Sequence, residues 1–126
     1  MRSACRWSAA VLCAAGIFVL SGIPDLKAPG PEIPGLDKFA HVIEYFIFAS
    51  VLWWALVGSN AVRAGLLTVA IAAAYAATDE LHQHFVPGRT MSFFDWVSDV
   101  TGAVLWVLAA LWMARRPTPP RQPQAP

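Results

Sequence analysis

The chain has 126 residues, of which 57% are hydrophobic and only 13% are charged, and its net charge is +1. Soluble domains average about 25% charged residues, so this composition indicates a membrane protein rather than a soluble one. The length fits one domain, and because there is no basic patch and no nucleic-acid-binding motif, we expect no nucleic acid as a partner.

Four apolar blocks follow one another along the chain, and each is close to the roughly 20 residues that a membrane-spanning helix needs. They cover residues 7–23, 39–57, 61–78 and 93–114. The third block is the weakest, because it is rich in alanine and short between Arg63 and Asp79. We therefore expect an all-α fold, a four-span transmembrane helical bundle that forms a single domain over residues 1–116. The proline-rich segment 117–126 is expected to be disordered.

The charges that flank the blocks predict the topology. Acidic residues gather in the first and third connections or at the helix ends beside them, where there are few basic residues. By the positive-inside rule, both termini are cytoplasmic and the acidic end of the bundle faces out. The basic residues that carry this argument lie before the first block, between the second and third, and after the fourth: Arg2, Arg6, Arg63, Arg115, Arg116 and Arg121.

The first block also resembles a secretory signal peptide, since a basic start precedes an apolar stretch that ends in small residues. We prefer an uncleaved anchor, because no clean small-x-small cleavage site follows and cleavage would leave an odd number of spans. The next segment, from Pro24 to Gly35, is rich in proline and glycine and predicts a stiff, non-helical loop.

The second helix opens with a polar cluster. Asp37 is a candidate N-cap, because its carboxylate can accept the free amide hydrogens of the first turn. His41, Glu44 and Tyr45 follow at helical spacing, so an imidazole, a carboxylate and a phenol share one face. The structural alternatives are an interfacial histidine and an aromatic-belt tyrosine, but neither explains a glutamate two turns into a span.

The third helix is expected from Ala64 to about Gln83. Its small residues Ala72, Ala73, Ala76 and Ala77 would let a neighbouring helix approach closely, and a homodimer is one use of that surface. At the outer end of this helix the spacing predicts two polar edges, one through Asp79, His82 and Gln83 and one through Glu80, Gln83 and His84.

Pro87 and Gly88 should end the third helix. Arg89 then follows beside the acidic residues, either as their counter-charge or as a fork for phosphate or carboxylate. Ser92 is a candidate N-cap for the fourth helix. Asp95, Asp99 and Gly102 fall on one stripe of that helix, so two carboxylates enter the span one above the other.

Three motifs in this order closely resemble the VanZ-like family of small bacterial membrane proteins: Asp37-Lys38-x-x-His41-x-x-x-Tyr45, Asp79-Glu80-x-x-Gln83-x-Phe85-x-Pro87-Gly88-Arg89, and Asp95 followed by Gly102. The family usually has asparagine four residues after the aspartate that aligns with Asp95, whereas this chain has Asp99 there. The resemblance implies a multi-pass protein of the bacterial cytoplasmic (inner) membrane, related to teicoplanin resistance proteins, and broader comparisons liken the family to enzymes acting on lipid head groups.

The resulting hypothesis is an outward-facing polar pocket that acts on the head group of a membrane lipid or a lipid-linked cell-envelope precursor. His41 or Glu80 would be the general acid or base, Arg89 and Lys38 would hold a phosphate, and Asp79, Asp95, Gln83 and Tyr45 would complete the pocket. A non-catalytic protein that binds an envelope precursor or a partner helix is the alternative.

A third hypothesis is a divalent metal site that draws on five polar positions. No HExxH motif or paired-cysteine spacing supports it, so we expect no metal and no cofactor. The candidate ligands would be His41, Glu44, Asp79, Glu80 and either His82 or His84.

Overall fold

The computed structural model describes residues 2–24, 35–58 and 60–115, and the regular structure of these residues is entirely helical. The helices are α1 (Arg2–Ser21), α2 (Leu36–Leu56), α3 (Ala61–Gln83) and α4 (Phe93–Ala114). Each is long and apolar enough to cross a membrane. The all-α prediction and the four candidate spans are therefore confirmed. The tail 117–126 and most of the predicted loop from Pro24 to Gly35 lie outside the described residues.

Two helix boundaries differ in an informative way from the apolar blocks. α3 has 23 residues and is the longest helix, because the polar residues from Thr78 to Gln83 continue it beyond the alanine-rich block. α2 begins at Leu36, after Gly35 in a left-handed conformation with φ 83°. The predicted Asp37 cap is wrong, since glycine adopts this conformation without strain and starts the helix earlier. The predicted Ser92 cap is confirmed, because its hydroxyl accepts a hydrogen bond from the Asp95 amide.

Small and aromatic side chains fill the interior. Tyr45 and Ala49 of α2, Ala72 and Ala76 of α3, and Ala103 of α4 are all 0% exposed within one apolar cluster. The small residues let the helices approach closely. Because Ala72 and Ala76 are buried within the chain, they are not available to a second copy, so a homodimer stays a prediction that would need other surfaces.

α2 and α4 make a close backbone contact at Gly102. An added Cβ on Gly102 would overlap the Val42 carbonyl oxygen and lie 3.0 Å from the Phe46 backbone nitrogen. Backbone atoms of α2 thus occupy the space that a side chain at position 102 would need. The glycine therefore sets the separation of the two helices one turn below Asp99.

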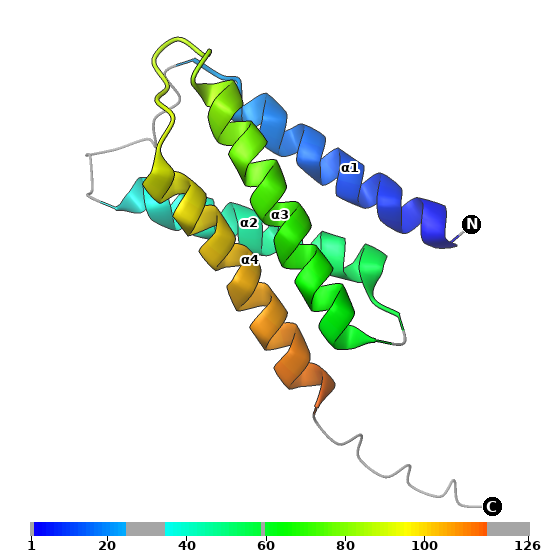
Figure 1. The fold of residues 1–126 in the computed structure, drawn as a ribbon. Helices are drawn as coiled ribbons and strands as arrows, with labels where there is room; N and C mark the ends of the chain where they lie inside the picture. The colour runs from blue at the N-terminus through cyan, green and yellow to red at the C-terminus, as the bar shows by residue number, and fades with distance from the viewer. Residues whose placement is uncertain (1, 25–34, 59, 116–126) are drawn as a thin grey trace, which may run out of the picture.

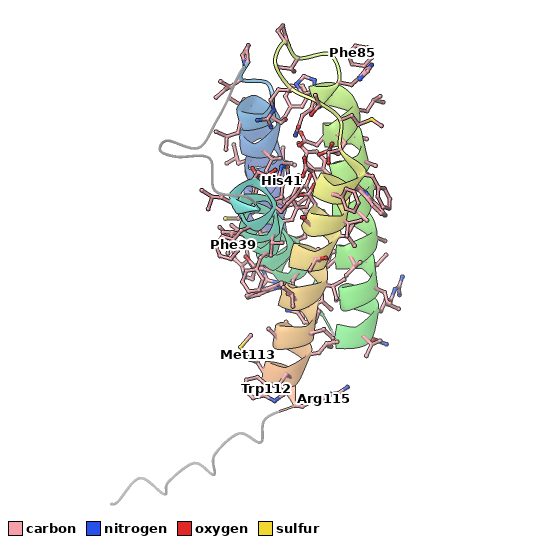
Figure 2. The ribbon with its side chains drawn as sticks, turned by 90° about the vertical axis from the view of Figure 1, so that its left-hand side faces the viewer. Phe39, His41, Phe85, Trp112, Met113 and Arg115 are labelled. Carbon is pink, nitrogen blue, oxygen red and sulfur yellow. The ribbon has the colours of Figure 1, made fainter. Side chains whose placement is uncertain are left out.

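The four helices bring their polar ends together. In Figure 1 the C-terminal ends of α1 and α3 lie at the same end of the bundle as the N-terminal ends of α2 and α4. Figure 2 shows His41 among the helices in the half of the molecule that carries Phe85, while Arg115 lies at the opposite end. The polar residues of α2 and of the α3–α4 region, far apart in the sequence, are therefore neighbours in space.

Candidate functional site

The central pair of the site is His41 of α2 and Asp99 of α4. His41 Nδ1 lies 2.9 Å from Asp99 Oδ1, and the Asp99 side chain is completely buried. An ionised carboxylate can only accept, so with Asp99 ionised Nδ1 donates this hydrogen bond. When the imidazole is neutral, the other ring nitrogen, Nε2, then presents a lone pair.

His41 also lies near two more carboxylates, those of Asp95 and Glu80. Its Nε2 lies 4.0 Å from Asp95 Oδ2, and both side chains keep 13% of their surface exposed. One potential ligand atom each of His41, Glu80 and Asp95 lie within 4.8 Å of one another. These residues come from three different helices, so the tertiary fold assembles the group. His41 and Asp95 are both partly exposed.

Lys38 lies at the rim of this group. Its ammonium forms an ion pair with Asp95 Oδ1 and another, at 2.8 Å, with Asp37 Oδ2. Lys38 stands one turn before His41 on α2, so the helix places its charge beside the same carboxylate that faces the imidazole. To hold a phosphate, as the sequence predicted, Lys38 would have to exchange one of these partners.

Glu80 is the buried member of the group, with only 4% of its surface exposed. Its Oε2 accepts a hydrogen bond of 2.6 Å from the backbone amide of Ser92. This contact ties the end of α3 to the residue that caps α4. The sequence predicted Ser92 as a cap but not this second role, which no spacing rule reveals because the donor is a backbone amide.

Asp79 and Gln83 form a separate polar edge that faces α1. Gln83 Nε2 donates to Asp79 Oδ2 over 3.1 Å, and the Ser21 hydroxyl donates to Asp79 Oδ1. His82 stacks on Phe18 at the same helix junction. The prediction of one edge through Asp79, His82 and Gln83 fits this arrangement, whereas Ser21 was not singled out in the sequence.

The remaining predicted residues lie around these two groups. Tyr45 is fully buried in the apolar cluster, and its electrostatic neighbours include Asp99 and Asp79. Arg89 is half-buried, and its charge acts on Glu44. The structure thus places Arg89 beside the acidic residues, as expected, and places Tyr45 one turn deeper than His41.

The histidines of α3 are not part of the His41 group. His84 is exposed, and His82 is engaged with α1. Of the two polar edges predicted for α3, the edge through Asp79 contacts α1. The other edge contributes only Glu80, which lies beside residues of α2 and α4. Of the potential metal ligands that the sequence offered, His41 and Glu80 come together, and Asp95 joins them.

Comparison with protein families matches the chain to a family model. The VanZ/LLP1 profile covers residues 6–114, which is most of the chain. The chain belongs to the VanZ/LLP1 family. No curated protein and no solved structure matches it. The match confirms the resemblance seen in the three motifs, and with the four candidate spans it describes a multi-pass membrane protein of the VanZ/LLP1 family.

Asp99 is the main site residue that sequence reasoning did not nominate. It was noted as a departure from the VanZ-like asparagine, and its position four residues after Asp95 predicted a shared stripe. In the structure the Asp99 carboxylate is hydrogen-bonded to the imidazole of His41 and so orients the ring. An asparagine oxygen could accept the same hydrogen bond, so the departure replaces a neutral acceptor by a carboxylate.

Proposed function

We propose that this VanZ/LLP1-family protein acts on the phosphate-bearing head group of a membrane lipid or of a lipid-linked cell-envelope precursor. The supporting observation is the His41–Asp99 pair, since a buried carboxylate that holds one ring nitrogen leaves the lone pair of the other for a reacting group. Ionisable residues at membrane depth are costly and usually functional. Their concentration at one end of the bundle supports a site for chemistry there.

Each predicted residue has a role in this proposal. His41 Nε2 is the central atom, and Glu80 is the second group able to exchange a proton. Lys38 and Arg89 would bind the phosphate and stabilise charge that develops on it. The residues that would hold these groups in position are Asp79, Gln83, Asp95 and Tyr45.

The orientation of the chain is part of the proposal. Arg115 lies at the end of the bundle away from His41 in Figure 2, and Arg63 is in the first turn of α3, which begins at that same end in Figure 1. By the positive-inside rule that end would be cytoplasmic. Both termini would then be cytoplasmic, and the polar group would face the outer side of the bacterial cytoplasmic membrane.

A non-catalytic role is the second candidate, and particular contacts favour it. Glu80 is held by the Ser92 amide, Asp79 by Ser21 and Gln83, and Asp95 by Lys38. These contacts could serve only to tie the helix ends together while the exposed rim binds a precursor. In that case His41 would be a structural hydrogen-bond donor.

The test uses the purified full chain in liposomes made from a bacterial lipid extract, with mass spectrometry of the lipids before and after incubation. We expect the wild type to convert a phosphate-bearing lipid and His41→Gln to abolish the conversion. His84→Gln is the matched control, because it makes the same substitution at an exposed histidine. If the folded wild type converts no lipid, but the wild type and His41→Gln bind the same lipid equally well, the binding role replaces the catalytic one.

A further inference from the structure

We infer that His41, Glu80 and Asp95 form a binding site for a divalent first-row transition-metal cation. One potential ligand atom from each residue lies within 4.8 Å of the other two. The inference deepens the proposed function by naming the ion that would act on the head group, and for that use of the ion it rests on the proposed function. The binding itself is argued from geometry alone.

The first support is the hydrogen bond between His41 and Asp99. Histidines that bind metals almost always donate their other ring N–H to a carboxylate, a backbone carbonyl or water, which fixes the tautomer and the ring orientation. Here Nδ1 is paired with the completely buried Asp99 at 2.9 Å. The lone pair of Nε2 is thereby held toward Asp95 Oδ2, 4.0 Å away.

The second support is the unused oxygen of Glu80. The Glu80 side chain is 4% exposed, and Oε2 is bonded to the Ser92 amide. Among the described residues, Oε1 has no hydrogen-bond partner although it is buried. A buried carboxylate oxygen without a partner carries an uncompensated desolvation cost. A cation shared with His41 and Asp95 would remove that cost.

The local charge points the same way. Acidic side chains exceed basic ones at this end of the bundle, at a depth where unbalanced charge is costly. Lys38 balances Asp95 in part, and Arg89 acts on Glu44. A divalent cation would offset this excess. The acidic side chains concerned are Glu44, Asp79, Glu80, Asp95 and Asp99.

The donor set indicates the class of ion. One imidazole nitrogen and two carboxylate oxygens suit Zn²⁺ or Mn²⁺ better than they suit ions that prefer thiolates. Ligands about 2.1 Å from a tetrahedral ion lie about 3.4 Å apart, so the side chains need to close by at most about 1.4 Å. Three protein ligands leave a position for water or a phosphate oxygen, as in catalytic sites.

A bound cation would change the part that His41 plays. Its Nε2 lone pair and the Glu80 carboxylate would both be ligands, so water would have to handle the proton instead. A cation in this position would also draw the oxygens of a phosphate group to the site and stabilise charge on them. Lys38, paired with the other oxygen of Asp95, would remain at the rim beside that phosphate.

The test measures metal binding to the purified full chain, freed of any histidine tag and stripped with a chelator. Zn²⁺ and Mn²⁺ are added separately, and bound metal is counted after equilibrium dialysis. We expect one equivalent of at least one ion, an affinity at least tenfold lower in Glu80→Gln and Asp95→Asn, and a loss of about 10- to 100-fold in Asp99→Asn. His84→Gln and Asp37→Asn, at exposed residues, should bind as the wild type does.

A second measurement needs no variant and so does not depend on how the variants fold. In pulsed electron paramagnetic resonance, Mn²⁺ bound at the site should show coupling to an imidazole nitrogen. The inference is overturned if less than stoichiometric metal binds, if His84→Gln removes the binding, or if bound Mn²⁺ shows no nitrogen coupling. If chelator-stripped protein still converts lipid, the metal has no part in the reaction and the proposed function stands. If the protein binds stoichiometric metal but converts no lipid, the metal site stands and the proposed function is rejected.

Discussion

Gly102 of α4 lies so close to Val42 of α2 that a Cβ at position 102 would overlap the Val42 carbonyl oxygen. His41 is the residue before Val42, and Asp99 lies one turn before Gly102. The close backbone contact therefore sets the separation across which His41 and Asp99 form their hydrogen bond. Both the packing of α2 against α4 and the hydrogen bond between His41 and Asp99 therefore require a residue without a side chain at position 102.

Gly102→Ala should destabilise the protein, because the obstacle is α2 backbone rather than a flexible side chain. We expect a loss of about 1–3 kcal/mol, typical of overpacking in a close-packed interior. Thermal unfolding in detergent measures it. Gly16→Ala is the control, since nothing lies within 4 Å of its added Cβ. Equal unfolding temperatures for the two variants would contradict the account of the α2–α4 contact.

Asp99→Leu should be more damaging to the fold than Asp99→Asn. Leucine leaves the Nδ1 hydrogen of half-buried His41 without its acceptor, which costs about 1–3 kcal/mol, whereas asparagine retains an acceptor oxygen. The comparison again uses thermal unfolding in detergent. If leucine were tolerated as well as asparagine, the hydrogen bond would not be what holds the imidazole in place.

Ser21→Ala should loosen the junction of α1 with α3. The substitution removes the hydroxyl that donates to buried Asp79, and a loss of about 1–3 kcal/mol is expected when a buried acceptor loses a partner. Ser8→Ala makes the same change at an exposed position of the same helix and should have little effect. Limited proteolysis can follow the release of α1, and indistinguishable cleavage of the two variants would argue against a structural role for Ser21.

The topology predicts which loops react with a membrane-impermeant thiol reagent. Phe85 is 75% exposed between α3 and α4, and Gly58 is exposed between α2 and α3. In a background with Cys5→Ala and Cys13→Ala, Phe85→Cys should be labelled in intact cells whose outer membrane has been made permeable. Gly58→Cys should be labelled only after lysis. The reverse pattern would invert the proposed orientation.

The helices were predictable because hydropathy and length are local properties. The blocks 39–57 and 93–114 nearly coincide with α2 and α4, and the Ser92 cap follows from a hydroxyl three residues before Asp95. The start of α2 was not predictable in this way, since Gly35 rather than a polar side chain sets it. The alanine face of α3 was recognised as a packing surface, but its partner within the chain was not.

The site was predictable only in part, because its contacts depend on how helices pack. The motifs nominated His41, Glu80 and Asp95 separately, and the structure brings them together. The pairing of His41 with Asp99 links residues 58 positions apart, which no helical spacing can reveal. Likewise, only the tertiary fold separates His41, inside the group, from the equally polar His84, which is exposed.

The central claim is that His41 and Glu80 serve chemistry on a lipid head group. Its most direct test compares the lipids and lipid-linked precursors of cells expressing the wild type, His41→Gln or Glu80→Gln at equal protein levels, with His84→Gln and Asp37→Asn as controls. We predict a modified species in wild-type and control cells that is absent with both site variants. Identical lipid profiles in all five strains, with the wild type folded in the membrane, would contradict the claim.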